Sequence, residues 1–360
     1  MAGQKDIIRC WVNYLIRHSH YMGAKVSIIV AVYNVAQYIE QCVRSLFGQT
    51  LADLEYIFVD DKSCDGSMDI VRKVLSEYPN REKQVRMIVH EENKGVAETK
   101  NEGIKSATGE YLIIIDPDDY VELNMMERMY EKAVKESADM VICDYYRFDE
   151  KESRRETAVP EGVIGDGENV RNDILNRRNP PFCVVRLFRR TLFYRDESVW
   201  PVGRFAEDII YSIVTAYYAK KITHVSEPLY HYRSHLSSLS HSLTEDACLV
   251  NYNGNKDNVD IMIGFLTAVG VADEYWRGIL IQKLRVRNRL LPIINKKHYR
   301  RMWFNTYPEI NKVLFWGDKR YHSTYREKVW FLCIAIGVYP LFKKYLGAKH
   351  FRPFPEWQAF

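Results

Sequence analysis

Three carboxylates follow a run of apolar residues near the middle of the chain. The run 111–115 leads directly into Asp116, Pro117, Asp118 and Asp119. An unbroken apolar run predicts a strand that is buried on both faces, and Pro117 prevents it from continuing as a paired central strand. Because alternate side chains of an extended chain point to the same side, Asp116 and Asp118 can face one ligand. Their mutual repulsion requires a cation or a hydrogen-bond donor between them, and a hard divalent ion with phosphate in its shell satisfies that requirement.

The alternative interpretation is a surface Asp-Pro-Asp turn that only caps the following helix. A second acidic strand end favours the ligand site. The apolar run 55–59 leads into Asp60 and Asp61, and ligands of α/β sheets gather at the carboxyl ends of the strands. Two strands that deliver carboxylates to one edge of a sheet are harder to explain by helix capping than either acidic pair alone.

Elements of alternating type position these residues. Apolar runs at 25–32, 55–59, 85–89 and 111–115 predict strands, and helical spacing between them predicts the intervening helices. This alternation implies right-handed βαβ crossovers and a mainly parallel sheet. A helix over 123–136 is expected to bury one face in the core; the residues of that face are Met126, Met129, Tyr130, Ala133 and Val134. A further strand is expected at 139–146.

The second half of the chain holds another acidic pair. The polar segment 148–169 is expected to be a long surface connection, and 183–190 combines apolar with basic residues. Glu207 and Asp208 then stand directly before an apolar helix at 209–219, where they could simply be favourable charges at a helix N-terminus. The segment 230–233 with the serines of 237–240 mixes aromatic, cationic and hydroxyl groups, which suits a mobile loop that contacts phosphate.

Composition limits the class of protein. The 360 residues carry a net charge of +4, which is too small to indicate nucleic acid as a partner. The seven cysteines form no CxxC pair, so neither a disulfide framework nor a zinc site is indicated, and a reducing cytoplasm is expected. Residues 1–17 contain no apolar core of a signal peptide. Residues 1–24 are expected to be an N-terminal extension, either an amphipathic helix or sequence that precedes a start at Met22.

The region 242–360 is expected to be helical and rich in basic and aromatic residues. Its most apolar run, 329–342, has two basic residues on each side. The run is shorter than the roughly 20 apolar residues that span a bilayer. A buried helix and an interfacial anchor that meets an anionic membrane surface remain equally open.

Taken together, the motifs resemble those of the inverting glycosyltransferases of family 2, which have the GT-A fold. The similarity covers about residues 25–241. Its parts are the opening strand 26–34, the turn 59–66, the segment 93–101, the acidic motif 116–119, the basic segment 186–190 and the pair 207–208. The sequence departs from the family pattern at Ala31, where Pro is usual, at Lys100, where Arg is common, and at Arg186, where Lys is usual. These departures bear on the identity of the donor more than on the fold.

The resemblance implies roles for individual residues. Asp61 would bind the nucleobase with Tyr33 nearby, Asp116 would approach the ribose, and Asp118 would ligate Mn²⁺ or Mg²⁺ at the diphosphate. Asp208 would be the general base that deprotonates the acceptor hydroxyl. The predicted donor-binding residues are Ala31, Tyr33, Asp61, Lys100, Asp116 and Arg233; Asp116 is also a predicted metal ligand beside Asp118.

The expected protein is therefore a metal-dependent inverting transferase with an α/β GT-A domain at 25–241 and a helical C-terminal region. It would move a sugar from a nucleotide-sugar, UDP-linked by expectation, to a glycan or lipid-linked acceptor of cell-surface polysaccharide synthesis. It would act in the cytoplasm, at the inner face of the membrane if the C-terminal region attaches there. A sugar nucleotidyltransferase would need a Gly-rich loop after the first strand, which 31–35 lacks. A catalytically silent scaffold would not need Asp61, Asp118 and Asp208 together.

Overall fold

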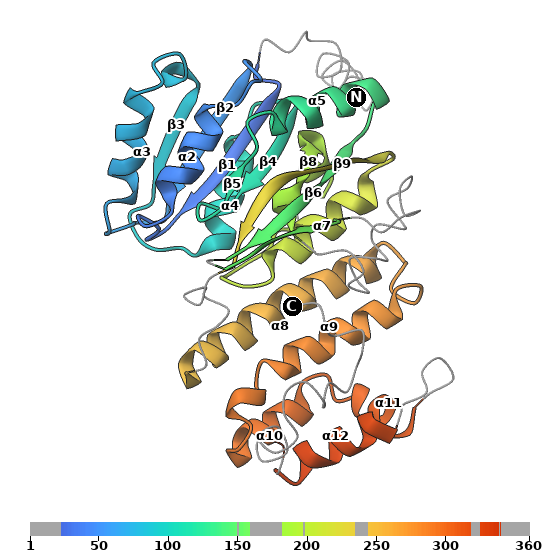
Figure 1. Ribbon diagram of the computed structural model, residues 1–360. Coiled ribbons are helices and arrows are strands. Elements are labelled where there is room, and N and C mark those ends of the chain that lie inside the picture. Colours follow the sequence, from blue (N-terminus) through green and yellow to red (C-terminus); the bar gives the residue numbers. More distant parts are fainter. Residues whose placement is uncertain are drawn as a thin grey trace, which may run out of the picture.

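A mixed sheet with helices against it lies above a group of C-terminal helices (Figure 1). The computed structural model describes residues 23–149, 151–158, 182–196, 199–234, 244–317, 325–337 and 339. Within these residues, nine strands form one sheet in the order β3-β2-β1-β4-β8-β6-β9-β5, with β7 paired to β6. The predicted α/β architecture with a helical C-terminal region is what the chain adopts.

Parallel strands build the N-terminal half of the sheet. They are β1 (Val26–Val32), β2 (Leu54–Asp60), β3 (Val85–Val89) and β4 (Tyr111–Ile115). Every residue of β1, β2 and β4 is buried, as expected for continuous apolar runs that are covered on both faces. The connecting helices are α2 (Ile39–Phe47), α3 (Ser67–Ser76), which follows β2, and α4 (Val96–Ser106), which follows β3 and the short 3₁₀ turn η1 (Glu82–Gln84).

The direction of the crossovers decides where a ligand can bind. The chain steps outward from β1 to β2 and β3, and then returns past β1 to β4. Right-handed crossovers in opposite directions put α4 on the other face from α2 and α3. The strand order therefore reverses between β1 and β4, and the crevice outside such a reversal is the usual binding position in an open α/β sheet.

Antiparallel pairing dominates the other half of the sheet. Its strands are β5 (Tyr120–Val121), β6 (Met140–Phe148), β7 (Ser153–Glu156), β8 (Arg186–Arg189) and β9 (Ile222–Arg233). Among the described strands of this half, only β6 and β9 run parallel, whereas β8 inserts antiparallel between β4 and β6. The predicted parallel character thus belongs to the first four strands, because the strands that complete the sheet are not joined by βαβ units.

Two sequence expectations need correction in this half. The segment expected to be a surface connection from 148 onward instead begins with a hairpin, since β7 pairs antiparallel with β6; residues 150 and 159–169 lie outside the described part. The segment 230–233 is not a loop but the end of β9, whose pairing with β6 continues to Arg233. The serines of 237–240 lie outside the described residues.

Helices α5 and α7 cover this half of the sheet. In α5 (Met125–Glu136), Met126, Met129 and Ala133 are buried as predicted, whereas Val134 is 51% exposed because it lies at the edge of the apolar stripe. α7 (Glu207–Tyr218) is apolar on most of its circumference and is buried from Ile209 to Ala216. Short 3₁₀ turns η2 (Cys183–Val185) and η3 (Arg190–Tyr194) flank β8.

In the described part of the C-terminal region, helices follow the sheet domain. They are α8 (Glu245–Ala268), α9 (Trp276–Asn288), η5 (Leu291–Ile293), α10 (Lys297–Asn305), α11 (Ile310–Trp316) and α12 (Tyr325–Ala335). α8 packs against α7 and α9, and the Trp303 and Trp330 rings, 5.6 Å apart, join α10 to α12. Within the described ranges, no helix has the length and apolar character needed to cross a bilayer.

Candidate active site

The loops after β1 and β2 are tied to each other at the carboxyl edge of the sheet. The backbone N–H of Asn34 donates to Ser63 Oγ at 3.2 Å, and that of Ala36 donates to Asp65 Oδ2 at 2.8 Å. Of the two residues expected here to contact the donor, Ala31 is buried within β1, whereas Tyr33 follows the strand and is 45% exposed. Tyr33 therefore presents its ring to solvent from a rigidly connected turn.

Asp61 is held by the segment that begins α4. Its carboxylate accepts the backbone N–H of Lys94 at 2.7 Å and of Gly95 at 2.8 Å. His90 Nδ1 lies 2.8 Å from the same carboxylate, and the other ring nitrogen lies 2.9 Å from Glu102. Asp61 is almost fully buried, so these contacts set the orientation of its carboxylate before any ligand binds.

The acidic turn after β4 divides its three carboxylates between two tasks. Asp119 is buried and accepts the Tyr230 hydroxyl at 2.5 Å and the Arg233 backbone N–H at 2.7 Å. Burial raises the pKa of Asp119 well above its usual range, and the charges of Asp118 and Asp116 add to this effect. Asp119 therefore fixes the turn against the end of β9. Asp116 and Asp118 remain partly exposed at the sheet edge.

The carboxylates at this turn can bind a cation only if a further ligand completes the coordination shell of the ion. Within the described residues, no group of three or more His, Cys, Asp or Glu side chains is arranged to hold a metal. Asp116 and Asp118 can supply two carboxylates, and Mg²⁺ or Mn²⁺ bound in this way takes its other ligands from substrate phosphate and water. The side chains are thus compatible with an ion that arrives together with a phosphorylated substrate.

Lys100 connects the acidic turn to the second acidic pair. Its Nζ lies 3.2 Å from Asp116 Oδ1, 2.9 Å from Glu207 Oε1 and 3.6 Å from Asp208 Oδ1. The lysine is only 3% exposed. Burial opposes its charge, but the three carboxylates outweigh that effect and hold the pKa of Lys100 above its usual range. Lys100, predicted to bind the donor, is thereby engaged by carboxylates from two distant parts of the chain.

Asp208 lies in the first turn of α7, where its carboxylate is poorly solvated. Its Oδ1 is buried and has no hydrogen-bond partner among the described residues. Burial raises the pKa of Asp208 to about 7; Lys100 lowers it, and the charges of Glu207 and Asp116 raise it. A carboxylate with a pKa near neutrality can take up a proton and release it again at physiological pH, as general base catalysis requires.

Arg186 supports α7 from the neighbouring strand. It is fully buried in β8, and its Nη1 donates to Ser212 Oγ. Burial lowers the pKa of Arg186. Of the basic segment 186–190, Arg186 therefore reaches the site indirectly, through the helix that carries Asp208.

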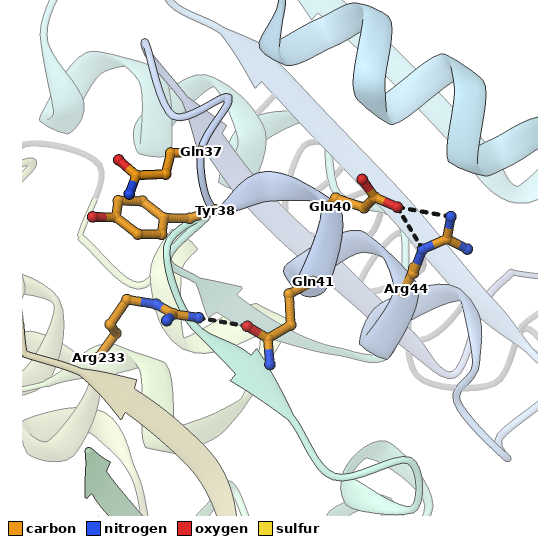
Figure 2. Close-up of a pocket in the computed structure, with 6 residues that line it drawn as sticks. All are labelled: Gln37, Tyr38, Glu40, Gln41, Arg44 and Arg233. Carbon is orange, nitrogen blue, oxygen red and sulfur yellow. Dashed lines mark hydrogen bonds and ion pairs between the residues drawn. The ribbon is translucent and has the colours of Figure 1, made fainter. Parts of the chain in front are cut away.

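Arg233 lines a pocket of about 540 Å³ beside the acidic turn (Figure 2). Its Nε donates to the Asp118 backbone oxygen at 2.8 Å, and its Nη2 donates to Gln41 Oε1 at 2.6 Å. The guanidinium also lies over the rings of Tyr38 and Phe148, at 5.1 and 4.7 Å from their centroids. The pocket is lined by Gln37, Tyr38, Glu40, Gln41, Arg44 and Arg233.

The pocket adds residues that the sequence did not single out. Apart from Arg233, its lining comes from the turn into α2 and the first turns of that helix. The signal available was their position, because they follow β1 at the point where the strand order reverses. Their polar residue types alone did not indicate a pocket. The structure brings Lys100, Asp116 and Asp208 together, while Asp61 and Tyr33 lie in the neighbouring β1 and β2 loops.

Comparison with known proteins gives a consistent result. The family model described as Glycosyl transferase family 2 matches residues 27–195. Glycosyltransferase GlyG of Streptococcus pneumoniae serotype 4 is 32% identical over 228 residues, which cover 61% of this chain and 73% of GlyG. EpsJ of Bacillus subtilis (strain 168), an uncharacterized glycosyltransferase, is 34% identical over 227 residues, which cover 60% of this chain and 62% of EpsJ. The chain thus spans less than two thirds of the length of EpsJ.

Among solved structures, TarS 1-349 of S. aureus in complex with UDP-GlcNAc is similar with a TM-score of 0.53. The sequences are 18% identical, and the similarity covers 82% of this chain and 92% of that chain. At this identity the likeness concerns the fold alone, and it confirms the predicted GT-A architecture.

Proposed function

Because the chain belongs to glycosyl transferase family 2, we propose that it transfers a sugar from a nucleotide-sugar to a hydroxyl of a glycan or lipid-linked acceptor. The donor is proposed to be UDP-linked, and Mn²⁺ or Mg²⁺ is proposed to bind with it. The observation that carries the proposal is the convergence of Asp116, Glu207 and Asp208 on Lys100. It joins a strand end suited to a diphosphate with a carboxylate suited to proton abstraction.

Donor binding is assigned to the edge formed by β1, β2 and β4. Asp61, already oriented by two backbone N–H groups, would accept a hydrogen bond from the nucleobase, with Tyr33 beside it. Asp116 would face the ribose and, with Asp118, the metal ion. When bound, the ion neutralises charge that develops on the departing diphosphate.

Arg233 is proposed to assist the leaving group from the pocket beside Asp118. In the structure its guanidinium is held by the Asp118 backbone oxygen and by Gln41. A diphosphate is a stronger partner for a guanidinium than a neutral amide, since it carries the opposite charge and can accept two parallel hydrogen bonds from the guanidinium. We expect Arg233 to exchange Gln41 for phosphate oxygens when the donor binds.

Asp208 is proposed as the general base. Its side chain is 21% exposed, so it can meet an acceptor, and burial raises its pKa to about 7. It would accept the proton of the acceptor hydroxyl as that oxygen attacks the anomeric carbon and the diphosphate departs from the opposite side. A single displacement of this kind inverts the configuration at the anomeric carbon. Glu207, buried against Lys100 at 2.9 Å, is the second candidate.

The acceptor and the place of action are proposed from the C-terminal region. Leu332 and Ile336, one turn apart near the end of α12, are 46% and 69% exposed. Lys328 precedes Leu332 by one turn and Ile336 by two, on the same side of the helix. These residues could rest on an anionic membrane surface that carries a lipid-linked acceptor of polysaccharide synthesis.

A ligand panel tests the proposed function directly. UDP-, GDP- and dTDP-sugars are added with Mn²⁺ or with EDTA, and the unfolding temperature is measured, because a ligand of the folded state stabilises it in proportion to its affinity. We expect one nucleotide class to raise the unfolding temperature, and to do so only with Mn²⁺. Asp118→Asn is the matched variant, and it should lose the Mn²⁺-dependent part of the rise in unfolding temperature. No shift with any nucleotide class would contradict the proposal.

A further inference from the structure

The loop 201–206, which leads into α7 and Asp208, is held by hydrogen bonds to two helices, α4 and α8. Asn101 of α4 donates to the Pro201 backbone oxygen at 3.0 Å. The Ala97 N–H, also from α4, donates to the Gly203 backbone oxygen at 3.0 Å. The second helix, α8, begins at Glu245 and therefore lies outside the segment 27–195 that the family model matches.

Asn258 of α8 makes all three of its hydrogen bonds to this loop. Its Oδ1 accepts the Val202 N–H at 2.9 Å, and its Nδ2 donates to the backbone oxygens of Val202 at 2.8 Å and Phe205 at 2.7 Å. The side chain is fully buried. One N–H and two carbonyl groups can be satisfied by a side-chain amide in a single orientation, whereas neither a carboxylate nor an ammonium group could satisfy all three.

The helix also lies close to the loop at Gly254. A Cβ at Gly254, one turn before Asn258, would stand 3.4 Å from the backbone nitrogen and the Cβ of Phe205. The loop then turns through Ala206, whose φ of 65° lies in the left-handed region that non-glycine residues rarely adopt. Such a conformation persists only where the surrounding structure imposes it. Asp208 follows two residues later.

We propose that Asn258 is a positioning residue for the proposed reaction: it holds the loop 201–206 so that α7 presents Asp208 to the acceptor hydroxyl. This inference rests on the proposed function of Asp208. It assigns to the C-terminal helices a part in building the catalytic centre, in addition to any role at a membrane. Donor binding, which is proposed to depend on the loops after β1, β2 and β4, should not need this anchor.

Asn258→Asp and Asn258→Ala test the proposal. The first keeps the size of the side chain but replaces the donor Nδ2 by an oxygen that faces the two carbonyl oxygens; the second removes all three hydrogen bonds and suits a helix. Because small displacements of a catalytic group can lower the rate by about 10²-fold, we expect kcat for transfer to fall by about that factor in both variants. The Kd for UDP with Mn²⁺ should stay within about twofold of the wild-type value.

Asn255 supplies the matched control. It is buried on the same helix, but its amide donates only to Asn251, one turn earlier. Asn255→Asp and Asn255→Ala should therefore leave kcat near the wild-type value. Hydrogen exchange at the Val202 amide provides a readout that does not depend on activity, because that N–H loses its acceptor in Asn258→Ala. The Val202 amide should exchange faster in Asn258→Ala, whereas its exchange rate should be unchanged in Asn255→Ala.

Each outcome decides the matter. Faster exchange in the loop, reduced kcat and retained nucleotide binding support the positioning role. Unchanged exchange, or unchanged kcat with a loosened loop, overturns it. Equal loss of kcat and nucleotide binding would also overturn it, since Asn258 would then support the whole fold. The wild-type chain could also transfer no sugar from any donor while the loop exchanges faster in Asn258→Ala. The proposed function would then be wrong, and Asn258 would have no role in catalysis.

Discussion

Replacing Lys100 by Met should destabilise the protein in a manner that depends on pH. The substitution keeps an unbranched side chain of similar volume, so it removes the charge without opening a large cavity. It leaves Asp116, Glu207 and Asp208 facing one another without the ammonium group that lies 2.9–3.6 Å from them. Removing one partner of a buried ion pair costs about 3–5 kcal/mol, because the remaining charge is left uncompensated.

The expected cost lies at the lower end of that range, about 3 kcal/mol at pH 8. The side chains of Asp116, Glu207 and Asp208 are 31%, 11% and 21% exposed, so water compensates part of their charge. Loss of Lys100 also removes the interaction that lowers the pKa of Asp208, and the pKa, already about 7, rises further. A carboxyl pKa that is raised in the folded state favours folding at low pH, and this contribution is lost as the pH rises through it.

The cost of Lys100→Met should therefore be largest above pH 8 and smaller at pH 6, where Asp208 takes up a proton. Urea unfolding of the wild type and the variant at both pH values measures the difference. Lys25→Met is the control, because the Lys25–Asp53 pair is 2.9 Å long but 41% and 59% exposed, and an exposed pair contributes about 0–1 kcal/mol. Equal costs for the two lysines at pH 8, or a larger cost for Lys100 at pH 6, would refute the inferred electrostatics.

Three further predictions concern the proposed reaction and location. Asp208→Asn keeps the shape of the side chain but cannot accept a proton, so transfer should fall by about 10²–10⁴-fold with nucleotide binding retained; near-normal transfer would move the role to Glu207. Asp118→Asn should weaken UDP binding with Mn²⁺ in calorimetry but not unfolding stability, and unchanged affinity would remove Asp118 from the metal site. In flotation with anionic liposomes, the double variant Leu332→Asp, Ile336→Asp should bind less than the full wild-type chain. Val250 is an exposed residue of α8, and Val250→Asp should not reduce binding. Equal flotation of the double variant and Val250→Asp would refute attachment through α12.

The sequence predicted the parallel half of the sheet because each of its strands carries its own signal. An apolar run such as Tyr111–Ile115 has to be buried on both faces wherever it lies in the fold. The end of β9 was misread for the opposite reason. Tyr230 to Arg233 alternate aromatic with charged groups, and that pattern becomes a strand only through its pairing with β6, more than 80 residues earlier. Tertiary context of this kind overrides local preference in strands more readily than in helices.

The same distinction separates the residues of the site from the contacts that organise it. Acidic side chains at strand ends can be recognised in the sequence by their type and position. Nothing in the sequence near Lys100 indicates that its ammonium group contacts Glu207, 107 residues later. A buried lysine needs such partners, since burial without them would neutralise it, but burial itself is a property of the folded chain. Asn258 illustrates the point further: asparagine within a helix is usually a weak helix former, and here three loop groups more than 50 residues earlier account for it. The proposed base is thus positioned by α4 of the sheet domain and α8 of the C-terminal region, and we expect neither part alone to suffice for transfer.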